Sequence, residues 1–123
     1  MDNQLTGEII GAAIEVHRHL GPGLLESVYE EALMYELVGK GLDAKQQLKL
    51  PLIYKGKQLE THFRIDILVN DEVIVELKSV QSIENIHKAQ LLTYLKMAKL
   101  RYGLLLNFNV PVMKQGICRL LNG

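Results

Sequence analysis

Two charged residues interrupt an otherwise apolar segment of the chain, residues 73–78 (Val-Ile-Val-Glu-Leu-Lys). The apolar run predicts a central, buried strand. Because residues two apart in a strand share a face, Glu76 and Lys78 are expected to project together, away from Val75 and Leu77. Buried charges are costly unless they pair or serve an ion. A salt bridge at a strand end explains these two residues alone, whereas a functional site needs further side chains beside them.

A second carboxylate is placed near Glu76 by the turn that precedes its strand. Asp66 and Glu76 are equally distant from Asp71, so a three-residue loop at 70–72 would set them directly opposite each other. A two-residue loop without a bulge would put them on opposite faces. Facing carboxylates repel each other unless a cation lies between them, and oxygen ligands suit Mg²⁺ or Mn²⁺. Such an ion, with Lys78 orienting a water molecule, is suited to phosphodiester hydrolysis.

The elements that must position these residues follow from apolar spacing along the chain. Helical spacing predicts helices at residues 4–20, 25–40 and 83–100, and Ser82 is the expected cap of the third. Shorter apolar patterns predict strands at residues 45–54, 58–69, 73–78 and 102–108, while 116–121 is either one more strand or a tail. Pro51 places the first strand at or near an edge. The order predicts an α/β fold with a mixed sheet flanked by helices.

Length and composition are those of one ordinary globular domain over residues 1–123, with 48% hydrophobic and 23% charged residues. No export signal and no membrane helix is indicated, and the single Cys118 has no disulfide partner, so we expect a cytoplasmic location. Residues 1–43 carry eight acidic and two basic side chains, a net charge of −6, which leaves +6 for the remainder of a neutral chain. This segregation is compatible with a basic face for phosphates, and equally with solvated faces that attract each other or a second copy.

Four segments together carry a resemblance to a known family. They are residues 23–29 (Gly-Leu-Leu-Glu-Ser-Val-Tyr), 64–69 (Arg-Ile-Asp-Ile-Leu-Val), 75–78 (Val-Glu-Leu-Lys) and 87–95 (His-Lys-Ala-Gln-Leu-Leu-Thr-Tyr-Leu). In this order they resemble the motifs of GxxExxY proteins, a family in the PD-(D/E)XK nuclease superfamily. The resemblance spans about residues 9–119 and implies a restriction-endonuclease-like core.

The resemblance also implies roles for particular residues. Metal ligands would be Asp66, Glu76 and the Leu77 carbonyl, and Lys78 would be the catalytic lysine. Glu26 is similar to the helical acid that contacts the metal or its water. Gln90 and Tyr94, one helical turn apart, resemble the helix motif that closes over the site.

Simpler interpretations exist for the candidate site residues other than Asp66, Glu76 and Lys78. Glu26 can be a first-turn acid that complements the helix dipole. Gln90 and Tyr94 can be boundary or core residues of an amphipathic helix, and Tyr29 is better explained by core packing than by catalysis. Arg64, expected on the strand face of Asp66, can contact phosphate or pair with Glu76.

The four histidines do not favour a zinc site. His17 and His19 are two apart on a predicted helix and therefore diverge, and His62 and His87 lack paired ligand spacing. His87 is better explained by a capping or surface role than by a place at the mouth of the site.

The sequence therefore predicts a metal-dependent nuclease-like domain that acts on nucleic acid, with DNA the first candidate and Mg²⁺ or Mn²⁺ as the cofactor. The alternative is a non-catalytic module that keeps the nuclease fold and binds nucleic acid or protein; a hydrolase of another phosphoester is a third reading. At this size we expect a homodimer or an unidentified protein partner to supply specificity, and no membrane association.

Overall fold

The computed structural model describes residues 3–123, which form three α-helices, one short 3₁₀ helix and five strands. Their bounds are α1 Gln4–Leu20, α2 Glu26–Gly39, β1 Ala44–Tyr54, β2 Lys57–Val69, β3 Val73–Lys78, α3 Asn85–Ala98, β4 Tyr102–Asn107, η1 Met113–Gly116 and β5 Ile117–Leu121. The expected element order is confirmed, and residues 117–121 are a strand rather than a tail.

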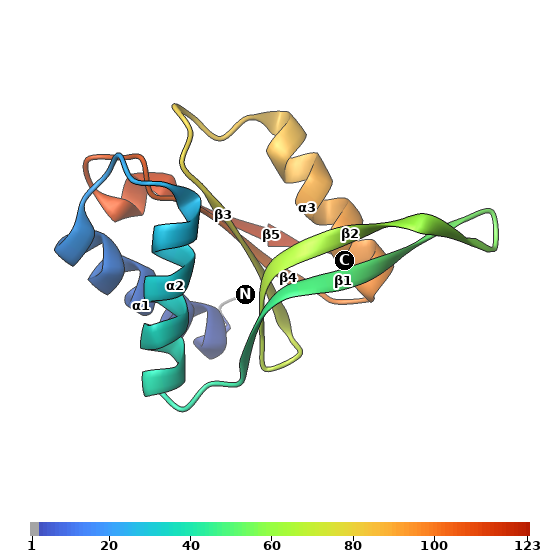
Figure 1. The fold of residues 1–123 in the computed structure, drawn as a ribbon, viewed down its shortest axis with the longest axis horizontal. Coiled ribbons are helices and arrows are strands. Elements are labelled where there is room, and N and C mark those ends of the chain that lie inside the picture. Colours follow the sequence, from blue (N-terminus) through green and yellow to red (C-terminus); the bar gives the residue numbers. More distant parts are fainter. Residues whose placement is uncertain (1–2) are drawn as a thin grey trace.

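The five strands form one mixed sheet, as predicted, and their order within it is β1-β2-β3-β4-β5. Only β3 and β4 are parallel, and the other neighbours are antiparallel. One core lies between the sheet and the helices α1 and α2, and a second lies between the sheet and α3 (Figure 1). Strand β3 is central and β1 is an edge, so the apolar run and the proline in these strands were interpreted correctly. Within residues 3–123, no helix is long and apolar enough to cross a membrane.

The buried side of α2 is narrower than its sequence suggests. Tyr29, Leu33 and Leu37 are fully buried, as expected. The apolar spacing of residues 25–40 also predicts Leu25 and Val28 on this buried side. That prediction is wrong, because Leu25, the N-cap, is 75% exposed and Val28 is 41% exposed. The reason is that α2 carries apolar residues on more than one side, and α1 and the sheet cover only one of them.

Helix α3 begins later than predicted, because another residue caps it. Glu84 is the N-cap and forms a capping box with His87: the Glu84 N–H donates to His87 Nδ1 at 3.0 Å, and the Glu84 side chain accepts from the His87 N–H. Ser82 is exposed and lies before the helix, so its assignment as the cap was wrong. The capping reading of His87 is confirmed.

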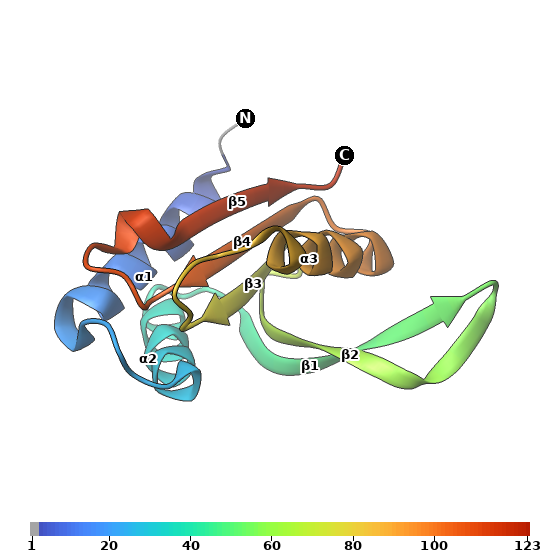
Figure 2. The ribbon, with the colours of Figure 1, turned by 90° about the horizontal axis from the view of Figure 1, so that it is seen from above.

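The β1–β2 hairpin changes direction close to Asp66. Gln47 in β1, which falls opposite Asp66, has a left-handed φ of 55°. Ile65 packs in the core under α3, whereas Ile67 packs in the core under α1 and α2, although regular alternation would put both on one face. The premise that Arg64 and Asp66 share a face, which assumed such alternation, therefore fails. Beyond this corner the hairpin extends away from the helices (Figures 1 and 2).

Candidate active site at the β2–β3 fork

The register of β2 and β3 sets Asp66 opposite Glu76. Val69 pairs with Val73 and Ile67 with Val75, so the loop between the strands has three residues, as the predicted site requires. The next pair in this register is Asp66 and Glu76. Regular pairing ends just before it, and the two carboxylates lie where β2 and β3 separate.

The carboxylates at this fork accept backbone hydrogen bonds from the two strands. The Asp66 N–H donates to Glu76 Oε2, and the Leu77 N–H donates to Asp66 Oδ2, both at 2.9 Å. The two side chains are thereby held in a fixed arrangement. Because the N–H and C=O of a strand residue point toward the same neighbouring strand, the Leu77 carbonyl also faces the fork.

Burial makes the ionised form of both carboxyl groups unfavourable. Glu76 is only 6% exposed, and its burial, followed by the nearby charge of Asp66, raises the pKa of Glu76 to about 8. Burial likewise raises the pKa of Asp66, against the opposing effect of the hydrogen bond from Leu77. The pair therefore tends to keep a proton near neutral pH unless a cation compensates the negative charge.

Lys78 follows at the end of β3, where it pairs with Asn107 of β4. Its positive charge partly opposes the effect of burial on Asp66 and Glu76. Within residues 3–123 Lys78 forms no ion pair, so the simple salt bridge with Glu76 is not formed. Arg64 also has no acidic partner among these residues and is exposed, so its pairing with Glu76 is not formed either.

Helix α2 directs two acidic residues toward the fork. Glu26 is the first residue of the helix, and its Oε2 accepts a hydrogen bond from the Ser79 N–H at 3.3 Å, directly after Lys78. The Ser79 hydroxyl donates to the Leu24 carbonyl at 2.8 Å. These bonds join the start of α2 to the end of β3, and Glu26 lies in the first turn of its helix, as predicted.

Glu30, one helical turn after Glu26, was not predicted as a site residue. Burial raises the pKa of Asp66 most, and the negative charge of Glu30 raises it further, while the hydrogen bond from Leu77 lowers it. Its carboxylate accepts from Gln46 Nε2 at 2.8 Å and from Gln47 Nε2 at 2.8 and 3.0 Å. Neighbouring strand residues normally point to opposite faces, and the left-handed φ of Gln47 allows both amides to reach one acid. The i, i+4 spacing from Glu26 was the available sequence signal.

Tyr29 fixes the entry into α2 rather than facing the fork. Its hydroxyl donates to the Gly21 carbonyl at 2.6 Å and accepts from the Leu24 N–H at 3.1 Å. Its ring stacks on Phe108, with centroids 4.5 Å apart. The core reading of Tyr29 is confirmed, and through the 21–24 turn it sets the position of Glu26.

Helix α3 brings one of its two expected site residues close to the carboxylates. Tyr94 is 6% exposed, its ring lies 4.8 Å from that of Phe63, and burial, followed by the charges of Glu76 and Asp66, raises its pKa. Gln90, one turn earlier, is exposed and forms no side-chain hydrogen bond in the described part of the chain.

A family model described as the PD-(D/E)XK nuclease superfamily matches residues 3–120. The chain belongs to this superfamily. No curated protein and no solved structure matches the chain. Apart from Leu121, the last residue of β5, the match covers every helix and strand, including both strands of the fork and the helices on either side of it.

Nucleases of this superfamily usually use divalent metal ions. The donors at the fork fit such an ion. The carboxylates of half-buried Asp66 and buried Glu76 repel each other and, like the backbone carbonyl, are hard oxygen ligands. Mg²⁺ typically completes its shell with water. Among residues 3–123 no three His, Cys, Asp or Glu side chains converge on one point that could hold a metal. The prediction that Glu26 contacts the ion or its water molecule, beside Asp66 and Glu76, therefore stays a prediction.

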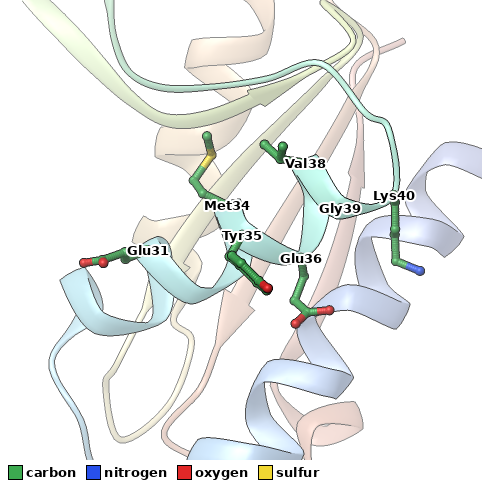
Figure 3. A pocket seen from close by; sticks show the side chains of 7 residues that line it. All are labelled: Glu31, Met34, Tyr35, Glu36, Val38, Gly39 and Lys40. Carbon is green, nitrogen blue, oxygen red and sulfur yellow. The ribbon is translucent and has the colours of Figure 1, made fainter.

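A hollow of about 660 Å³ lies on the outer side of α2 (Figure 3). Glu31, Met34, Tyr35, Glu36, Val38, Gly39 and Lys40 line it. None of the residues expected at the site is among them. Glu31 thus lies on a different side of α2 from its neighbour Glu30, and it offers a matched control for experiments on the fork.

Proposed function

We propose that this PD-(D/E)XK domain is a metal-dependent nuclease of the GxxExxY type, which hydrolyses phosphodiester bonds at the β2–β3 fork. The observation that carries the proposal is the pair of half-buried Asp66 and buried Glu76, with Lys78 next to it and in no ion pair within residues 3–123. Such a cluster is destabilising in a purely structural role, because burial makes both carboxylate charges costly. It is suited to binding a cation and holding a water molecule.

In this proposal Asp66, Glu76 and the Leu77 carbonyl hold Mg²⁺ or Mn²⁺. The bound ion would neutralise phosphate charge and make a water molecule more acidic. Lys78 orients that water for attack on phosphorus. Glu26, which lies beside Ser79 at the end of β3, accepts a hydrogen bond from a water molecule next to the direct ligands.

The remaining expected site residues act on the substrate side of the fork. Tyr94 and Gln90 cover it from α3, Tyr94 by excluding solvent and Gln90 by contacting the nucleic acid. Arg64, exposed and without an acidic partner in the described part of the chain, contacts a phosphate. Association as a homodimer or with a partner protein, and a cytoplasmic location, are further parts of the proposal that the chemistry at the fork does not require.

The proposal is tested by titrating Mg²⁺ and Mn²⁺ into the wild type and an Asp66→Ala, Glu76→Ala double variant by calorimetry, and then assaying the same samples for nucleic-acid cleavage. We expect binding and cleavage in the wild type, and neither in the variant. A folded wild type that binds no metal at millimolar concentration would contradict the proposal and favour the non-catalytic binding module.

Glu30 is expected to support catalysis by fixing water around the direct ligands. Glu30→Gln keeps the shape of the side chain but loses the charge that faces Asp66 and the optimal acceptor for two glutamine amides. We expect a roughly 10- to 100-fold lower kcat and weaker Mg²⁺ binding, with KM little changed, as for supporting residues of other metal sites. Steady-state kinetics and calorimetry measure this. Glu31→Gln, on another side of the same helix, should leave all three values unchanged; equal losses in both variants would rule out a role for Glu30 at the fork.

A further inference from the structure

The outer half of the β1–β2 hairpin, residues 49–64, is an arm that extends beyond the helices (Figures 1 and 2). Its strands pair with each other as far as Tyr54 and Lys57, and Lys55 and Gly56 make the turn. Near the corner its inner face is covered by α3, through Leu50 and Phe63. No helix covers the distal part of the arm, so two of its apolar side chains are exposed, Ile53 at 44% and Tyr54 at 58%.

The arm is basic and its charges are not neutralised within the molecule. It carries Lys49, Lys55, Lys57 and Arg64 against the single acid Glu60, a net charge of +3. None of these four cations forms an ion pair within residues 3–123. Lys45, at the base of the hairpin, is by contrast paired with Asp71 at 3.6 Å. The arm thus contributes half of the positive excess of residues 44–123, which is +6.

The arm begins at the fork itself. Arg64 lies two residues before Asp66, and Lys57, at the other end of β2, lies nine residues before it. At about 3.3 Å per strand residue the tip is ~30 Å from the carboxylates. One turn of duplex DNA is about 34 Å long, so the arm can contact one turn of a duplex whose backbone reaches the fork.

We propose that this arm binds duplex DNA in its major groove and so places a backbone phosphate at the cation site proposed at Asp66 and Glu76. The major groove of B-form DNA admits a two-stranded β-ribbon, whereas that of A-form RNA is too narrow for side chains to read. The lysines contact phosphates along the groove, and Tyr54, with Lys55 Nζ 5.5 Å from its ring centre, meets base edges or sugars at the tip. This inference rests on the proposed function for its substrate and adds the class of nucleic acid.

A simpler explanation of the lysines is protection of the edge strand. Charged residues and proline on an edge strand discourage pairing with other chains, and β1 carries Lys49 and Pro51, with Lys55 directly after it in the turn. This explanation does not extend to Lys57 and Arg64, since β2 is paired on both sides at its base and with β1 along the arm. The two explanations predict different losses when the lysines at the tip are neutralised.

The test measures DNA binding in a Glu76→Gln background, which isolates binding from cleavage. Fluorescence anisotropy with a duplex of about 20 base pairs gives Kd over a series of NaCl concentrations. Lys55→Gln, Lys57→Gln is expected to lower the slope of log K against log[NaCl] by about 1.8 and to weaken binding roughly 10- to 100-fold near 0.1 M salt, because each lost phosphate contact removes about 0.9 from the slope. Lys96→Gln, Lys114→Gln makes the same change of charge on α3 and η1 and should leave both values unchanged.

Several outcomes would overturn the inference. Equal losses in the two double variants would show that only total charge matters. Unchanged affinity in the tip variant, with self-association detected by light scattering, would support edge protection instead. Tighter binding of RNA duplex or of single strands than of DNA duplex would contradict the assignment to the major groove.

One further result separates this inference from the proposed function. If the tip variant loses DNA binding as expected while the wild type cleaves nothing with Mg²⁺ or Mn²⁺, the arm is a DNA-binding element and the proposed nuclease activity is wrong.

Discussion

Replacing Glu76 with glutamine is expected to make the metal-free protein more stable at pH 8 while abolishing cleavage. Glutamine keeps the shape of the side chain, and its carbonyl oxygen can accept the hydrogen bond from the Asp66 N–H. The substitution removes a carboxylate whose burial raises its pKa to about 8. We expect the free energy of unfolding at this pH to rise by about 1–3 kcal/mol, since the variant buries no second charge beside Asp66.

The pH dependence of stability follows from the same raised pKa. The folded chain binds the Glu76 proton more tightly than the unfolded chain, whose glutamate has its ordinary pKa near 4.5. The stabilisation is therefore complete below about pH 4.5 and is lost as the pH rises toward about 8. Urea unfolding of the metal-free wild type should show this decline, and Glu76→Gln should show much less of it.

Divalent ions should reverse the order of stability of the two proteins. An ion that binds only the folded wild type adds about 4.1 kcal/mol at a thousand times its Kd, which exceeds the advantage of the variant, and the variant lacks the site that would give this gain. Glu72→Gln, an exposed acid in the loop before β3, is the control and should match the wild type with and without Mg²⁺. A Glu76→Gln variant that is destabilised at pH 8 without metal would mean that the carboxylate stabilises the fold, contrary to the proposal.

The relative position of the two carboxylates could be predicted from sequence because it depends on the number of residues in the loop between their strands. The loop at 70–72 has turn-forming residues between two apolar runs, so its length sets the register, and the register sets which residues face each other. Asp66 and Glu76 required no knowledge of packing. The central position of β3 and the edge position of β1 likewise follow from an apolar run and a proline.

The contribution of Glu30 could not be predicted in the same way. It depends on the left-handed backbone conformation of Gln47 inside a strand. A glutamine does not favour this conformation, which costs roughly 1–3 kcal/mol. The exposed side of α2 was missed for a related reason. Periodicity shows that Val28 and Leu33 are both apolar, but only the packing of α1 and the sheet decides that Leu33 is covered and Val28 is not.

Replacing Lys78 with methionine is expected to lower the cleavage rate by about 10²- to 10⁴-fold without weakening metal binding. Methionine keeps most of the aliphatic stem of a half-buried side chain but cannot donate to water. In the wild type the ammonium group of Lys78 lowers the pKa of Asp66 and of Glu76, but by less than burial raises them. Its removal leaves the carboxylates without that neighbouring positive charge, so a bound cation meets less repulsion and its affinity should stay equal or rise.

This separation of rate from affinity distinguishes a catalytic lysine from a structural one. Single-turnover cleavage gives the rate, and calorimetry with Mg²⁺ gives the affinity in the same preparation. Lys88→Met is the matched control, because Lys88 is also half-buried but lines a separate hollow with Gln81 and Cys118. Lys78→Met could instead lose metal affinity and thermal stability together. If the loss of rate were then no larger than the loss of bound metal and of folded protein accounts for, Lys78 would only stabilise the structure of the fork. A full loss of rate with intact metal binding places the lysine in contact with the reacting water.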